Sequence, residues 1–145
     1  MRVFMQKFII ILFLLFPNIS ALSHPHVFID NAFIFVFDDN SLAGIKVKWI
    51  FDEMFSASVI MDFDTNQNNI FEENEIKAVE QGAFSNLKNY NYYLYITIDN
   101  IKSHVSEIQD FTAEIKNNRI IYYFFIPLNI KGEKKEKRVQ AGCYD

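Results

Sequence analysis

Apolar and polar positions change their spacing twice along the chain, which divides it into strands, helices and strands again. Residues 27–37 are almost continuously apolar and rich in β-branched and aromatic side chains, which predicts a strand buried on both faces. Residues 38–41 (DDNS) are turn formers, and Gly44 is expected to give the backbone freedom beyond that turn. Residues 45–49 alternate strictly, which predicts a half-buried strand paired antiparallel with the first.

From residue 50 the apolar spacing becomes helical. The first predicted helix covers residues 50–63 and places its apolar side chains near one stripe: Phe51, Phe55, Val59, Ile60 and Phe63. A second predicted helix covers about residues 73–87 and turns another apolar set inward: Ile76, Val79, Ala83, Phe84 and Leu87. We therefore expect a helical hairpin after the first two strands.

Strand patterns return after Asn89, over residues 92–98, 106–115 and 119–128. Asn117 and Asn118 suit a two-residue hairpin turn, because asparagine tolerates positive φ. The charged run at residues 131–138 (KGEKKEKR) is more typical of a solvated loop than of a binding patch. The order of elements predicts a single α+β domain, in which a helical hairpin is inserted into an antiparallel sheet.

The segment between the predicted helices, residues 64–75 (DTNQNNIFEENE), has the spacing of a twelve-residue EF-hand calcium loop. Oxygen atoms fall at the ligand positions of such a loop: Asp64, Asn66, Asn68, the backbone carbonyl of Ile70, Glu72 and Glu75. Phe71 stands at the apolar position that leaves the loop and is expected to enter the core. The sequence therefore predicts an EF-hand-like loop within the helical hairpin.

Two departures from the EF-hand pattern weaken the predicted affinity. Asn69 stands where glycine is usual, although asparagine is the next best residue for a left-handed backbone. Two ligand positions hold amides rather than carboxylates, so we expect a Kd of about 10⁻⁴–10⁻³ M, as in extracellular modules. A register starting at Asp62 is excluded, because it puts Asn69 where an apolar residue belongs. The alternative is a metal-free turn whose amides cap the backbone.

Residues 1–23 are predicted to be a cleavable signal peptide. They hold a basic start, an apolar run, a helix breaker and small residues before the cleavage point: Arg2, Lys7, residues 8–16, Pro17, Ala21 and Ser23. The apolar run of about nine residues is far shorter than the roughly 20 of a membrane span, so an uncleaved anchor is disfavoured. We expect an exported chain that begins at His24 and has no stable membrane insertion.

Cleavage changes the size and charge of the chain. Removing 23 of the 145 residues leaves 122, which suits one domain, residues 24–145, with a workable core. Because Arg2 and Lys7 are lost from the 14 basic residues, 12 remain against 18 acidic ones, a formal charge of −6. This charge argues against nucleic-acid binding and suits a protein that handles cations. Cys143 is the only cysteine, so no internal disulfide can form.

The expected amino terminus gathers nitrogen donors. His24, its α-amine and His26 form a candidate site for a transition metal, with His104 as a candidate third histidine. The common amino-terminal copper and nickel site requires the backbone N–H of the second residue to lose its proton. Pro25 has no N–H, so that geometry is excluded. The alternative for each histidine is an ordinary surface or hydrogen-bonded imidazole.

Residues 24–30 (HPHVFID), residues 49–56 (WIFDEMFS) and the EF-hand-like loop follow one another in an order that resembles the domain-of-unknown-function 1007 family. The resemblance implies a bacterial periplasmic component of an ABC-type or nickel/cobalt-type metal transport system, connected with zinc acquisition. Asp52 and Glu53 would either orient a histidine ligand or occupy the positive field at a helix start, and the second role is preferred. Family members continue past residue 145, which makes a C-terminally truncated copy one expectation.

These observations lead to a functional hypothesis with one alternative. We expect a periplasmic accessory protein that binds a divalent transition metal in support of a membrane metal permease, with a structural calcium ion in its loop. The alternative is a calcium-stabilised structural or protein-interaction domain without a transport role. An enzyme is not expected, because no nucleophile–base spacing or cofactor loop is found.

Overall fold

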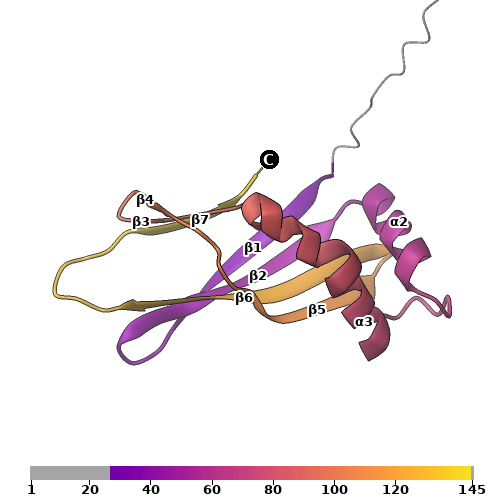
Figure 1. Cartoon of the computed structure of the whole chain (residues 1–145), viewed down its shortest axis with the longest axis horizontal. Helices are drawn as coiled ribbons and strands as arrows, with labels where there is room; N and C mark the ends of the chain where they lie inside the picture. The colour runs from indigo at the N-terminus through magenta and orange to yellow at the C-terminus, as the bar shows by residue number, and fades with distance from the viewer. Residues whose placement is uncertain (1–26, 145) are drawn as a thin grey trace, which may run out of the picture.

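The computed structural model describes residues 27–144 and contains two antiparallel sheets (Figure 1). The first sheet has the order β1-β2-β6-β5 and the second the order β4-β3-β7. Their strands are β1 (Ile29–Phe37), β2 (Ser41–Phe51), β3 (Leu94–Ile98), β4 (Ile101–Ser103), β5 (Gln109–Lys116), β6 (Arg119–Lys131) and β7 (Val139–Cys143). The fold is therefore α+β with antiparallel sheets, as expected. The predicted signal peptide, residues 1–23, lies outside the described residues.

The helices lie between β2 and β3 in the sequence and across the first sheet in space (Figure 1). Helix α2 (Glu53–Phe63) contacts β6, and α3 (Glu73–Val79) contacts β5. After α3 the chain continues as a π-helix, η1 (Glu80–Phe84), and a 3₁₀-helix, η2 (Ser85–Tyr93). The inserted helical segment is confirmed, but regular α-helix ends at Val79, earlier than expected. Within the described residues, no helix has the length and apolar character that crossing a bilayer requires.

The start of the first helix was predicted three residues too early. Ile50 and Phe51 belong to β2, because inward-facing Val47, Trp49 and Phe51 continue the two-residue period of the strand. The helix begins only after Asp52, whose carboxylate accepts the backbone N–H of Phe55 at 2.9 Å and caps the helix.

The prediction that the first strand is buried on both faces is wrong. Strand β1 is an edge strand that pairs only with β2 among the described strands. Ile34 and Phe37 consequently expose 63% and 71% of their areas. A continuous apolar run favours a buried strand, but it does not show whether other elements cover both faces of that strand.

The core gathers aromatic side chains from the first sheet and the helical segment. Trp49 is fully buried and meets Phe124 edge-on, with their ring centroids 4.9 Å apart. Phe84 of η1 stacks on Phe111 of β5 at 4.4 Å. Leu94 and Ile96 of β3 join the same core, so the second sheet is attached to the first through apolar contacts.

Two small features connect the strands. Asn117 and Asn118 have φ values of 53° and 59°, which confirms the predicted hairpin turn between β5 and β6. Gly44 lies within β2 rather than beside a turn, and its φ is not positive, so the expected role is wrong. Its hydrogen is needed because a Cβ atom there would lie 2.3 Å from the carbonyl oxygen of Ile126 on β6.

Candidate cation-binding loop and the anchor of the first strand

Asp64 organises the loop that joins α2 to α3. It follows the last residue of α2, and its Oδ1 and Oδ2 accept the backbone N–H groups of Asn68 at 3.2 Å and Asn69 at 2.9 Å. The residue is only 5% exposed. The loop is therefore wound around a buried carboxylate at its first position.

The asparagines form the turn within this loop. Asn66 Oδ1 accepts the N–H of Asn68 at 3.0 Å, and Asn68 Oδ1 accepts the N–H of Ile70 at 2.8 Å. Asn69 has φ of 60°, which confirms that asparagine takes the left-handed conformation at this position. Phe71 is 6% exposed and enters the core as expected, whereas the neighbouring Ile70 is 63% exposed.

Glu75 closes the loop from α3. Its Oε1 accepts both the N–H of Thr65 at 2.8 Å and the Thr65 hydroxyl at 2.7 Å, and its Oε2 accepts the N–H of Glu72 at 3.1 Å. The Thr65 hydroxyl, followed by the Glu72 N–H, lowers the pKa of Glu75 below its ordinary value of 4.5. Glu75 is only 2% exposed, so the loop begins and ends on buried carboxylates.

The remaining predicted ligand, Glu72, lies on the exposed side of the loop. The side-chain amide of Asn68 donates to Glu72 Oε1 at 3.2 Å. Within residues 27–144, no three His, Cys, Asp or Glu side chains assemble into a metal-binding group. A cation in this loop would therefore rely on amide and backbone carbonyl oxygens as well as carboxylates, as Ca²⁺ does in proteins.

The predicted histidine site is described only in part. His24 and His26 lie outside the described residues. His104 is exposed in the segment between β4 and β5. Ligation of a transition metal by these three histidines stays a prediction.

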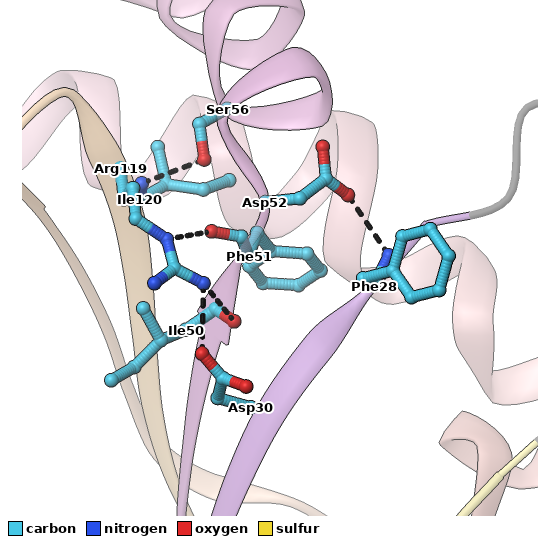
Figure 2. A network of polar contacts seen from close by, with 8 residues as sticks. All are labelled: Phe28, Asp30, Ile50, Phe51, Asp52, Ser56, Arg119 and Ile120. Carbon is cyan, nitrogen blue, oxygen red and sulfur yellow. Dashed lines mark hydrogen bonds and ion pairs between the residues drawn. The ribbon is translucent and has the colours of Figure 1, made fainter.

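Asp52 anchors the chain at Phe28, which lies two residues after His26 in the sequence (Figure 2). Its Oδ2 accepts the N–H of Phe28 at 2.9 Å, and its own N–H donates to the carbonyl of Phe28 at 2.9 Å. The N–H of Phe55, together with that of Phe28, lowers the pKa of Asp52. The preferred position of Asp52 at a helix start is confirmed, and the same carboxylate also holds the first residues of β1.

Arg119 and Ser56 complete this anchor, and sequence analysis missed both. The Arg119 guanidinium donates to the carbonyl oxygen of Phe51 and, at 3.0 Å, to Asp30 Oδ2 (Figure 2). The buried Ser56 hydroxyl accepts the N–H of Ile120 at 3.0 Å. These groups lie just past the last β2–β6 pair, so side chains hydrogen-bond the backbone groups there in place of a paired strand. The signal in the sequence was the charge of Asp30 within an apolar run.

The fold and loop define the class of protein: an α+β domain whose helical segment carries a loop wound between two buried carboxylates. The chain belongs to the family described as protein of unknown function DUF1007, whose model matches residues 9–145. This match confirms the family that the order of the sequence motifs indicated.

Two curated relatives are similar to the chain. It is 32% identical over 77 residues to an uncharacterised 15.5 kDa protein in the trpE 3′ region of Spirochaeta aurantia, which covers 53% of this chain and 55% of the relative. It is 28% identical over 131 residues to an uncharacterised protein of Haemophilus influenzae, which covers 90% of this chain and 63% of the relative. The chain thus spans just over half the length of each relative. No solved structure matches it.

Proposed function

We propose that this chain is a periplasmic accessory protein that handles divalent metal ions in support of a membrane metal permease, and that its loop at residues 64–75 binds a structural Ca²⁺ ion. The observation that carries the proposal is the pair of buried carboxylates, Asp64 at 5% and Glu75 at 2% exposure. They come from the two helices that flank one loop, and acidic side chains are rarely so buried without a compensating partner.

The hydrogen bonds leave acceptor capacity for a cation. Each carboxylate oxygen can accept more than one donor, and both oxygens of Asp64 and Oε2 of Glu75 accept a single backbone N–H each. The loop amides thus hold the carboxylates in place without exhausting their lone pairs. A bound Ca²⁺ would offset the like charges of Asp64, Glu72 and Glu75 and tie α2 to α3.

The transition metal is assigned to the expected amino terminus. His24 and His26, with the α-amine exposed by cleavage after Ser23, supply the nitrogen donors that Zn²⁺, Ni²⁺ and Co²⁺ prefer. The two hydrogen bonds between Asp52 and Phe28 support this assignment, because they fix the backbone two residues after His26 to the start of α2. His104 is retained as a candidate third ligand.

Native mass spectrometry of protein purified from the periplasm tests the transition-metal assignment. We expect a chain that begins at His24 and retains one zinc ion, and we expect His24→Ala with His26→Ala to abolish zinc binding without altering the fold. Lys46→Ala with Lys48→Ala is a matched double control on the surface of β2. Unchanged zinc binding in the histidine variant, or a chain that keeps its leader, would overturn the assignment.

The second candidate function is a calcium-stabilised structural or protein-interaction domain without a transport role. It is favoured by the position of the buried carboxylates in the loop, whereas His104 is exposed on another part of the molecule. The two functions differ in their metal response. The structural domain predicts thermal stability that rises with Ca²⁺ and is indifferent to Zn²⁺, Ni²⁺ and Co²⁺.

A further inference from the structure

Strand β1 presents an open edge of the first sheet. It pairs with β2 from Ile29 opposite Phe51 onward, and no described strand pairs with its other side. The N–H of Asp52 donates to the carbonyl of Phe28, so the even-numbered residues of this regular antiparallel pair bond toward β2. The backbone N–H and C=O groups of Ile29, Asn31, Phe33 and Phe35 therefore point away from the sheet.

The opposite edge of the same sheet is built differently. Strand β5 has an irregular register between Gln109 and Thr112, and Asp110 there has φ of 53°. Its exposed positions also include Glu114 and Lys116. Bulges and charges of this kind prevent a foreign strand from pairing with an edge.

Strand β1 has neither a bulge nor a row of charged side chains along most of its length. Its register with β2 is regular from Ile29 to Val36, and its only charged residue is Asp30. The carboxylate of Asp30 is paired with the Arg119 guanidinium at 3.0 Å. The edge is therefore nearly uncharged, on a chain whose formal charge is −4.

Large apolar side chains are exposed along this edge strand and the residue before it. Phe28, Ile34, Phe35 and Phe37 expose 72%, 63%, 37% and 71% of their areas. At roughly 200 Å² for each fully exposed side chain, this is about 490 Å² of exposed apolar area per copy. Two copies together present about 970 Å² of such area, and because edge pairing covers only part of it, the interface falls below the roughly 1,000 Å² of a stable specific interface and is a weak one.

We propose that β1 pairs antiparallel with β1 of a second copy of this chain, so that two four-stranded sheets join into one continuous sheet. A two-fold axis beside Phe33 uses the full length of the strand and places Phe33 opposite itself. Ile29 then lies opposite Phe37 of the second copy, and Asn31 lies opposite Phe35. This arrangement is isologous, as in most homodimers, and pairs the outward-facing backbone groups with one another.

Charge also suits a second copy. In this register each Asp30 lies opposite Val36, six residues from its counterpart, so the two carboxylates are about 20 Å apart. Exposed Ile34 faces Ala32 of the second copy on one surface of the joined sheet, and Phe33, Phe35 and Phe37 lie on the other. No like charges oppose each other within the paired strands, and cross-strand aromatic contacts favour association. The inference does not depend on metal binding.

Sedimentation velocity of the full exported chain, over roughly 1–200 μM, tests the proposal because a weak interface dissociates within that range. Two variants disrupt the edge in different ways. Asn31→Pro removes one outward N–H without removing a bond to β2, and proline is tolerated on edge strands. Ile34→Glu places a carboxylate near the two-fold axis. Lys46 lies opposite residue 34 on β2, so the new carboxylate has a cation beside it and the monomer fold is preserved.

We expect a reversible monomer–dimer equilibrium whose Kd rises at least about tenfold in either variant, because a hydrogen-bonded and desolvated edge is lost. Ile101→Glu is the matched control, since Ile101 is 73% exposed on β4 and should leave the equilibrium unchanged. Circular dichroism verifies that each variant is folded. If Asn31→Pro does not fold, the dimerisation of Ile34→Glu decides the test. A monomer throughout the concentration range, or a dimer unaffected by the folded variants, would overturn the proposal.

Discussion

Glu75 Oε1 lies 2.8 Å from the backbone nitrogen of Thr65 and 2.7 Å from its hydroxyl oxygen. These bonds join residues ten positions apart and close the loop between α2 and α3. The carboxylate that ends the loop is thus held in place by the chain itself. A cation binding there would act on a preformed loop and would not have to fold it, which lowers the entropic cost of binding.

Thr65→Val tests how much this closure contributes. The change removes the hydroxyl but keeps the backbone N–H and the branched shape, so one hydrogen bond to a carboxylate is lost. We expect the free energy of unfolding, measured with urea, to fall by about 1–2 kcal/mol. Thr112→Val is the control, because Thr112 is exposed on β5. Equal stability of the two variants would contradict the role assigned to the hydroxyl.

The acid side of the stability profile follows from lowered pKa values. Glu75 and Asp52 have folded-state pKa values below their ordinary 4.5 and 3.8, mainly because the Thr65 hydroxyl and the Phe55 N–H bind the ionised forms. At low pH the unfolded chain binds more protons than the folded one. The stability that these groups contribute is therefore fully present above about pH 5 and is lost as the pH falls through their folded pKa values.

Urea unfolding between about pH 7 and pH 3 measures this loss. We expect Glu75→Gln to be less stable at neutral pH and to lose less stability on acidification, because its side chain does not titrate. Glu73→Gln, an exposed neighbour on α3, should keep the slope of the unaltered chain. A Glu75→Gln slope equal to that of the unaltered chain would exclude Glu75 as a source of acid sensitivity.

Arg119→Met should loosen the start of β1 from the sheet. The variant keeps an apolar stem but loses the donors to the carbonyls of Phe51 and Ile50 and the ion pair with Asp30. We expect the free energy of unfolding to fall by about 1–3 kcal/mol, with faster amide hydrogen exchange at Phe28. Lys116→Met removes a neighbouring exposed cation on β5 and should change neither quantity. Unaltered exchange at Phe28 in Arg119→Met would contradict the anchoring role.

Gly44→Ala should destabilise the β2–β6 pair. A Cβ atom at this position would lie 2.3 Å from the Ile126 oxygen and 2.4 Å from the Phe125 ring, so the strands must separate. We expect a cost of about 1–3 kcal/mol in thermal unfolding. At Gly142 the nearest atom is 3.5 Å away, so Gly142→Ala is a control of little effect. A Gly44→Ala variant as stable as this control would show that β6 can shift without cost.

Local features of the fold could be predicted from the sequence. The left-handed asparagines at 117, 118 and 69, the burial of Phe71 and the helical segment between strands follow from residue type and apolar spacing. Each of these features is indicated by residues that are close together in the sequence. The expectations that succeeded were therefore those whose cause lies within one turn or one hairpin.

The features that could not be predicted depend on distant partners. The edge position of β1 depends on the order of the strands in the sheet, which its apolar pattern does not encode. Gly44 is required by the approach of Ile126, and Arg119 meets Asp30 across 89 residues of sequence. The pairing of Glu75 with Thr65 was hidden for a similar reason, because the EF-hand pattern assigns Glu75 to a cation rather than to the chain.

A calcium titration followed by amide chemical shifts tests the central claim, that the loop at residues 64–75 binds Ca²⁺. We predict saturable shifts centred on Asn66, Asn68 and Asn69, with a Kd of about 10⁻⁴–10⁻³ M, and a stabilisation of about 1.4–2.7 kcal/mol at roughly 10 mM Ca²⁺. Asp64→Asn should abolish both effects, whereas Asp62→Asn, exposed just before the loop, should preserve them. Loop amides that do not shift up to about 20 mM Ca²⁺, or that shift equally in Asp64→Asn, would contradict the claim.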